Sequence, residues 1–142
     1  MATGTSLSSY LEDQILNWIK GTAVVAAPVT LYAALYTASP TDAAASGTEV
    51  TGNAYARVAI TSSTGWSVIA AGAAGTGDSI TNAGIITFPT PTAAWGTVLA
   101  MALYDAATVG NEVVWAALTA SKVVNSGDTV SFAVGAISIA VD

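Results

Sequence analysis

Neither cysteine nor histidine occurs among the 142 residues of this chain. Without cysteine there is no disulfide, and without clusters of cysteine and histidine there is no structural zinc site. A chain of this length buries about two thirds of the surface of its unfolded form, so a hydrophobic core alone can hold the fold together. The length suits one structural domain, which we expect to span residues 1–142.

The same two absences limit the chemistry that the chain can perform. Histidine and cysteine supply most of the bases, nucleophiles and metal ligands that work near neutral pH. What remains is nine carboxylates and three basic residues, Lys20, Arg57 and Lys122. We therefore predict a structural protein rather than an enzyme, with no cofactor and no metal. Three scattered basic residues also form no phosphate-binding groove, so no nucleic acid is expected as a partner.

Few of the residues are charged. Hydrophobic residues make up 53% of the chain and charged residues 8%, against about 25% charged in ordinary soluble domains. The longest uncharged run, residues 79–104, contains Pro89, Pro91 and several polar residues, so no membrane span is expected. Because long charged side chains are depleted at interface centres, the composition favours burial against copies of the chain or a fixed scaffold. The alternative is a soluble β protein kept apart by its net charge of −6.

One helix is predicted over residues 9–20. Ser9 and Glu12 have the spacing of a capping box, and Gly21 is a natural stop. Leu11, Ile15 and Trp18 recur at helical spacing and form an apolar stripe. A helix of about three turns is marginal alone, so the stripe must dock. It covers either the protein's own sheet or a partner, and in the second case these three residues are interface residues.

Residues 29–141 have the pattern of short strands separated by turn residues. Runs rich in Val, Ile, Thr and aromatic residues are bounded by Gly, Asn, Asp, Ser or Pro. This regular spacing predicts a mainly β fold, an antiparallel sandwich or barrel with one N-terminal helix. Residues 37–48 and 70–78 are predicted to be flexible loops. Residues 31–36 and 99–104 resemble each other, as two strands in similar environments would. The predicted strands are 29–36, 57–61, 65–70, 84–88, 97–104, 112–118, 129–134 and 137–141.

Two pairs of charged residues are candidates for specific roles. Asp105 and Glu112 flank a predicted hairpin loop, and two carboxylates about 5–10 Å apart are what a glycosidase needs. Loop solubility explains them equally well. Arg57 lies near Glu49 and Tyr55 in the sequence, which suggests a structural ion pair with Glu49 or a cation–π contact. The alternative is an edge-strand arginine that reaches water.

The four tryptophans divide into two groups. Trp18 and Trp115 fall on apolar helix or strand patterns, which favours the core. Trp66 and Trp95 each lie beside a glycine at a predicted turn, which favours exposure. Exposed tryptophan marks an interface, so Trp66 and Trp95 are candidate contact residues for a protein partner or a sugar.

Several segments together resemble small structural proteins of tailed bacteriophages, which are often labelled tail fibre proteins. The segments are, in order, residues 11–16 with Gly21, 35–42, 47–50, 55–58, 88–89, 94–97, 104–107, and 124–128 with Phe132. The resemblance implies a virion protein. For a small, acidic, non-repetitive chain, it favours a capsid decoration or cement protein that binds the major capsid protein and itself, as a dimer or trimer. The alternative is a tail fibre or receptor-binding module that contacts a host-surface glycan through Trp66, Trp95 and loop 37–48. A carboxylate-based hydrolase comes third.

Overall fold

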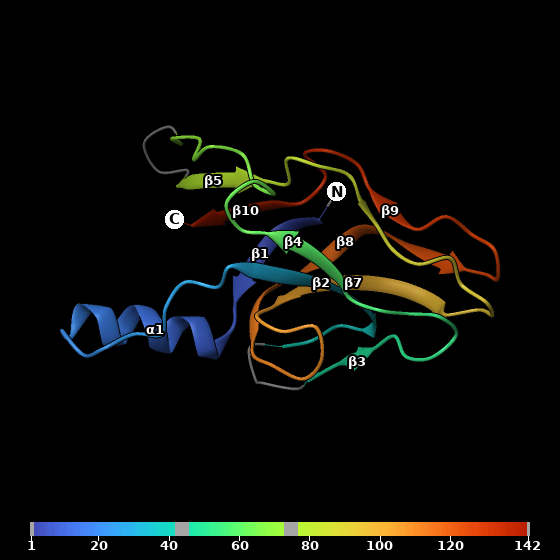
Figure 1. Ribbon diagram of the computed structural model, residues 1–142, viewed down its shortest axis with the longest axis horizontal. Coiled ribbons are helices and arrows are strands. Elements are labelled where there is room, and N and C mark those ends of the chain that lie inside the picture. Colours follow the sequence, from blue (N-terminus) through green and yellow to red (C-terminus); the bar gives the residue numbers. More distant parts are fainter. Residues whose placement is uncertain (1, 42–45, 73–76, 142) are drawn as a thin grey trace.

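The computed structural model describes residues 2–41, 46–72 and 77–141 (Figure 1). In these residues the chain forms one helix and ten strands, so the prediction of a mainly β fold with one helix near the N-terminus is confirmed. The elements are β1 (Ala2–Leu7), α1 (Ser9–Ile19), β2 (Thr30–Ala38), β3 (Thr48–Glu49), β4 (Val58–Thr61), β5 (Asp78–Thr81), β6 (Ile86–Thr87), β7 (Gly96–Tyr104), β8 (Glu112–Val124), β9 (Ser131–Phe132) and β10 (Ser138–Val141).

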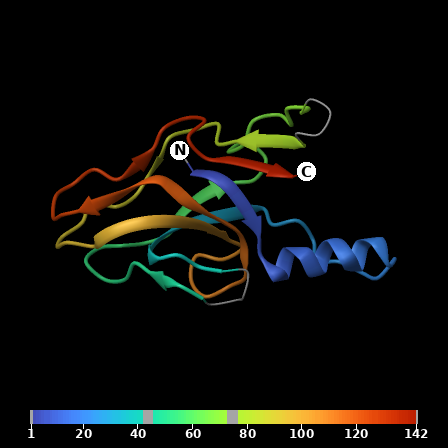
Figure 2. The same ribbon diagram turned by 180° about the vertical axis from the view of Figure 1, so that it is seen from behind.

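The main sheet has six antiparallel strands. Its order is β1-β8-β7-β2, and both β3 and β4 pair with the far side of β2. Two small antiparallel sheets, β10-β5 and β6-β9, complete the fold, and Figure 2 shows the arrangement from behind. In the described residues the main sheet is open at β1 and at β3 and β4, so it does not close into a barrel.

Residues alternate between two buried clusters on the two faces of the main sheet. On β2, Ala33 and Leu35 belong to the larger core, whereas Ala34 and Tyr36 belong to the smaller one. This is the period of two that a strand imposes on its side chains. The larger core also contains Ile86, Phe88, Val130, Phe132 and Ile137, which belong to β6, β9 and the segments beside them. Both faces of the central strands are therefore covered.

The two similar segments, 31–36 and 99–104, lie in neighbouring strands at the centre of this sheet. β2 and β7 pair with Ala34 opposite Ala102, and both alanines are fully buried. Tyr36 and Tyr104 follow these alanines by two residues on the same face, one on each strand. Because the strands are antiparallel, the two tyrosines lie on opposite sides of the alanine pair, and the small alanines leave room between the rings.

One predicted strand is absent, and some observed strands were not predicted. Residues 65–70 form no strand but only two isolated bridges, Trp66 to Asn82 and Ala70 to Ser79. β1 and β3 were not predicted, because neither segment has a clear alternating pattern in the sequence. They are strands because β1 pairs with β8 and β3 pairs with β2. Strand structure extends into the ends of both predicted loops, at Ala38, Thr48 and Asp78. Residues 42–45 and 73–76, the middle of those loops, lie outside the described residues.

The helix begins at Ser9, as predicted, but its N-cap lies one residue earlier than expected. Ser8, not Ser9, is the N-cap, and its side chain accepts a hydrogen bond from the backbone N–H of Leu11 at 3.3 Å. Ser8 is preferred because it is buried against β8, where its hydroxyl also donates to the carbonyl oxygens of Glu112 and Val113. The helix ends at Ile19, and Gly21 reverses the chain with a φ of +70°.

α1 projects from the β body in both views (Figures 1 and 2). None of its residues is buried. Residues 20–29 return along the helix, and the backbone N–H of Val25 donates to Gln14 Oε1 at 2.9 Å. We call α1 and residues 20–29 together the arm. No helix in the part of the chain that the structure describes is long and apolar enough to span a membrane.

Candidate functional site

A chain of polar side chains crosses the smaller buried face of the main sheet. Tyr36 on β2 donates to the hydroxyl of Tyr104 on β7 at 2.5 Å, and Tyr104 donates to Glu112 Oε2 at 3.1 Å. All three residues are buried, and Glu112 is only 3% exposed. Three neighbouring strands are thus linked through side chains as well as through their backbones.

Arg57 joins this chain to the nearby loop. Its Nε and Nη2 donate to the two carboxylate oxygens of Glu49 at 2.8 and 2.7 Å, a bidentate geometry that gives strong, directional pairing. Nη1 donates to the carbonyl oxygens of Ala106 and Val109 at 3.0 and 2.7 Å. The guanidinium carbon lies 3.6 Å from the ring centre of Tyr104, within cation–π range. The structure thus brings Glu49 and Arg57 together, and the edge-strand arginine that reaches water is not found, since the side chain is 8% exposed.

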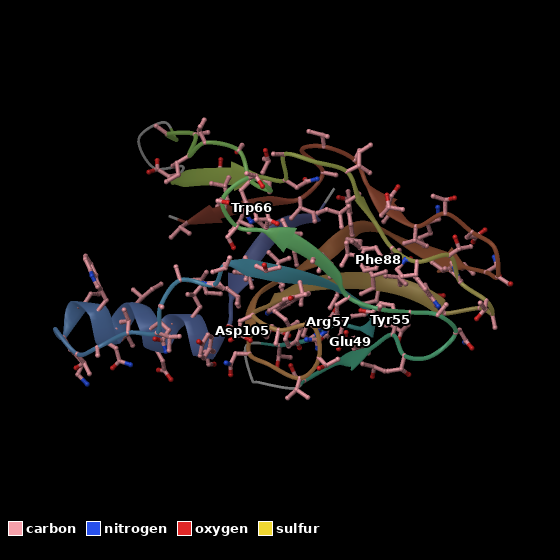
Figure 3. All side chains as sticks on the ribbon, in the orientation of Figure 1. Glu49, Tyr55, Arg57, Trp66, Phe88 and Asp105 are labelled. Carbon is pink, nitrogen blue, oxygen red and sulfur yellow. The ribbon has the colours of Figure 1, made fainter. Side chains whose placement is uncertain are left out.

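Tyr55 completes the surroundings of Glu49. Its hydroxyl donates to Glu49 Oε1 and accepts from the backbone N–H of Leu35, both at 2.9 Å. Figure 3 shows Glu49, Tyr55 and Arg57 grouped together, with Trp66 well apart from them. We call Tyr36, Glu49, Arg57, Tyr104 and Glu112 the polar network.

The electrostatics of the polar network keep its tyrosines neutral. Burial raises the pKa of Tyr36, and donation to Tyr104 raises it further. Burial also raises the pKa of Tyr104, and the charge of Glu112 acts in the same direction. Burial by itself would lower the pKa of Arg57, but the hydrogen bonds and charge of Glu49 outweigh it and raise that pKa. At neutral pH, therefore, neither phenol is a base, and Arg57 stays charged.

A cavity of about 310 Å³ opens beside the polar network and is lined by Ser8, Tyr10, Asn111 and the network residues themselves. Of the two carboxylates of the hydrolase hypothesis, Glu112 lines this cavity and Asp105 does not. Asp105 accepts from the backbone N–H and the Nδ2 of Asn111 at 2.7 and 2.8 Å, which closes the loop. Glu112 instead accepts from Tyr104. In the described residues no three metal-ligating side chains cluster.

The loop between β7 and β8 is held in a strained shape. Val109 has a φ of +57°, which is unfavourable for a β-branched residue, and its carbonyl oxygen accepts from Arg57. Gly110 follows with a φ of +73°, and a Cβ there would lie 2.5 Å from Asp105 Oδ1. Arg57 and Asp105 together therefore fix this loop from its two sides.

The candidate interface residues of the helix differ in exposure. Leu11 is half-buried and packs against the larger core. Ile15 is 39% exposed and Trp18 is 73% exposed. The expectation that Trp18 belongs to the core is wrong. The helix projects beyond the main sheet, so the sheet does not cover Trp18.

The expectation that Trp66 and Trp95 form an exposed pair is also wrong. Trp95 is 7% exposed; its ring packs edge-on against Tyr55 at 5.4 Å, and its Nε1 donates to the carbonyl of Asn53 at 3.1 Å. Trp66 is half-buried against the same core. Gly96, at the first position of β7, has a φ of +88°. The turn at Gly96, which had suggested that Trp95 is exposed, instead directs its indole ring into the core.

Sequence reasoning missed Tyr36, Tyr104 and Ser8. The repeated pattern of residues 31–36 and 99–104, each ending in tyrosine, was the available signal for the first two. Ser8 had no signal of its own, because only the contact with β8 distinguishes it from Ser9.

The fold and the site together define a β-rich protein whose polar groups hold its own loops and whose arm is apolar and exposed, features typical of a structural subunit. Residues 6–140 match the family described as podophage GP4 fiber I protein gp80, and the chain belongs to this family. It is therefore a structural protein of a phage virion. No curated protein matches the chain.

Proposed function

We propose that the protein is a non-catalytic structural subunit of a phage fibre. The observation that carries this proposal is the match to the fibre family over residues 6–140, which includes both the β body and the arm. The two candidate functions thus change places, because the sequence alone had favoured capsid decoration over a fibre role.

The polar network supports a structural role. Each nitrogen of the Arg57 guanidinium donates within the chain, so the only arginine is fully used in holding β3 and the 105–110 loop. Asp105 closes that loop, and Glu112 accepts from a neutral phenol. The hydrolase hypothesis asks these two carboxylates to act together, whereas each has its own partners in the fold.

Capsid decoration is the second candidate. The arm favours it, because an exposed apolar helix on a weakly charged chain suits docking on a lattice of the major capsid protein. A receptor-binding role with a host-surface glycan has less support, since Trp95 is buried and the proposed aromatic pair is not formed.

Copy number and position in purified virions test the proposal. We expect quantitative mass spectrometry to find a few to a few tens of copies per particle, scaled to the major capsid protein in the same sample. Immunogold labelling should then mark the tail. Hundreds of copies, with label over the whole head, would overturn the fibre proposal in favour of capsid decoration.

A further inference from the structure

The arm carries the largest group of exposed apolar side chains along the sequence. Seven of the fourteen large apolar side chains that are exposed among the described residues lie between residues 15 and 29. They are Ile15, Leu16, Trp18, Ile19, Val24, Val25 and Val29. Scattered exposed apolar residues are ordinary, whereas a group of them indicates an interaction surface.

These side chains lie on more than one side of α1. Ile15 and Trp18 line a groove of about 530 Å³ between the helix and residues 24–28, whereas Leu16 and Ile19 do not. Leu16 lies about 200° round the helix from Trp18. Leu16, Trp18 and Ile19 are each more than half exposed. A flat protein surface would cover only one side of the helix, whereas a fluid apolar phase entered by the end of the arm would contact both.

Polarity changes along the arm from its base to its free end. Glu12 and Asp13 lie near the first turn, where Ser8 attaches the helix to β8. Beyond Asp13, Lys20 is the only charged residue of the arm. From Ile15 to Lys20 the helix advances about 8 Å, and interfacial helices bury their apolar side chains about 5–10 Å into the boundary between lipid headgroups and acyl chains. The end of the arm thus has the length that such a boundary accommodates.

Trp18 and Lys20 are residue types that suit a lipid boundary. Tryptophan is enriched at the level of the headgroups, because its ring is apolar and its N–H is polar. Lysine keeps its apolar stem in hydrophobic surroundings while its ammonium group reaches polar groups nearby. In the described residues Lys20 forms no ion pair, so its ammonium group is available to a lipid phosphate.

A second apolar site lies at the same end of the molecule. The β5–β10 sheet and the arm project from one end of the β body in both views (Figures 1 and 2). Val68 and Ile69 lie beside β5, since the next residue, Ala70, forms a bridge with Ser79, and they are 87% and 70% exposed. Residues 58–72 contain no charged residue. Two apolar projections at one end would enter a lipid surface together.

We propose that the end of the arm inserts into the surface of a phospholipid bilayer, with Val68 and Ile69 as a second contact. For a virion protein, this bilayer is a membrane of the host cell. The proposal goes beyond the proposed function and does not rest on it. Burial of apolar side chains drives the insertion. Because the chain carries a net charge of −6, anionic lipids oppose it, and zwitterionic lipid is the preferred surface.

Sedimentation with vesicles tests the contact. We expect the purified full chain to pellet with phosphatidylcholine vesicles. Ile19→Glu places a charge at the inserted end and should lower the partition coefficient at least tenfold. The matched control is Val123→Glu, which makes the same change of charge at an exposed residue of β8 and should bind as the wild type does. Circular dichroism of each variant verifies that the β fold is kept.

Three outcomes of this experiment would overturn the proposal. The wild-type chain could stay in the supernatant, binding could survive Ile19→Glu, or Val123→Glu could weaken binding equally. Val68→Glu/Ile69→Glu should weaken binding less than Ile19→Glu does, and unchanged binding of this variant would contradict the second contact. A chain that ignores vesicles but binds another virion protein through the arm would assign this surface to that protein instead.

The charge of the lipid tests what drives binding. Mixing phosphatidylglycerol into the vesicles should weaken binding at low salt, because the acidic chain is repelled by the anionic headgroups. Stronger binding to these vesicles would mean that the protein is attracted by headgroup charge, and it would contradict insertion driven by apolar burial.

Tryptophan fluorescence gives an independent test, because Trp18 is exposed and the other three tryptophans are buried or half-buried. Vesicles should shift the emission to shorter wavelength, and brominated phosphatidylcholine should quench it. Both changes should disappear in Trp18→Phe, which should still pellet with vesicles. Quenching that remains in Trp18→Phe would place another part of the chain in the lipid and would rule out the arm as the inserted segment.

Discussion

Two cations show how differently the β body and the arm use their side chains. Arg57 in the body is 8% exposed and directs every guanidinium nitrogen to a partner within the chain. Lys20 at the end of α1 is exposed and has no ion pair among the described residues. The apolar residues differ in the same way, since Leu103 is fully buried and Leu16 is 57% exposed. The body thus places these side chains in its interior, whereas the arm leaves them exposed to solvent.

The largest expected difference in the free energy of unfolding is between a leucine-to-alanine substitution in the body and one in the arm. Leu103→Ala removes a fully buried side chain and should lower the free energy of unfolding by about 3–5 kcal/mol. Leu16→Ala should change it by less than about 0.5 kcal/mol. Urea denaturation at a concentration where the chain is monomeric measures both. Equal losses would mean that the arm is packed as the body is.

Loss of the Arg57 side chain should have the next largest effect. Arg57→Met leaves Glu49 without its ion pair and frees the carbonyls of Ala106 and Val109, so we expect a loss of about 3 kcal/mol in unfolding free energy. Lys122→Met makes the same change of charge at an exposed residue and should cost less than about 0.5 kcal/mol. A similar result for the two variants would contradict a structural role for the polar network.

The junction between body and arm should show a smaller effect. Ser8→Ala removes the helix cap and two hydrogen bonds to β8, so the free energy of unfolding should fall by about 1–2 kcal/mol. Ser9→Ala, at the neighbouring exposed position, should leave it nearly unchanged. Thermal and urea unfolding of the two variants decide which serine is the cap, and the reverse order would favour the capping box predicted from the sequence.

The smallest effect at neutral pH should come from Tyr36→Phe, about 1 kcal/mol for one hydrogen bond. Its pH dependence is more informative. Because the pKa of Tyr36 is raised in the folded state, the unfolded chain releases the phenol proton first. The stabilisation is complete below about pH 10 and is lost above it, at about 1.4 kcal/mol per pH unit per phenol. Above pH 10, the free energy of unfolding should fall less steeply with pH in Tyr36→Phe than in the wild type. Identical slopes for the two proteins would contradict the raised pKa of Tyr36.

Sequence predictions that depend on neighbouring residues are more accurate than those that depend on distant parts of the chain. The helix, the period of two in β2 and the turn residues depend on neighbours along the chain, and these predictions hold to within a residue or two. Trp95 and Trp18 were misplaced in opposite directions, because exposure depends on which distant segment lies above a residue. β1 was missed, because its ladder comes from β8, more than a hundred residues later.

By itself, the sequence determined the class of fold and the residues available for chemistry. The strand periodicity, the single helix signal and the absence of cysteine and histidine required a mainly β protein held by its core, and the spacing of Glu49 and Arg57 suggested their pairing. Only the tertiary structure decided that Tyr36, Tyr104 and Glu112 meet on one face, and that Ser8 joins the helix to β8. It also decided that Ile15 and Trp18 of the apolar stripe are left exposed. These depend on which strands become neighbours, and strand pairing is set by contacts between residues far apart in the chain.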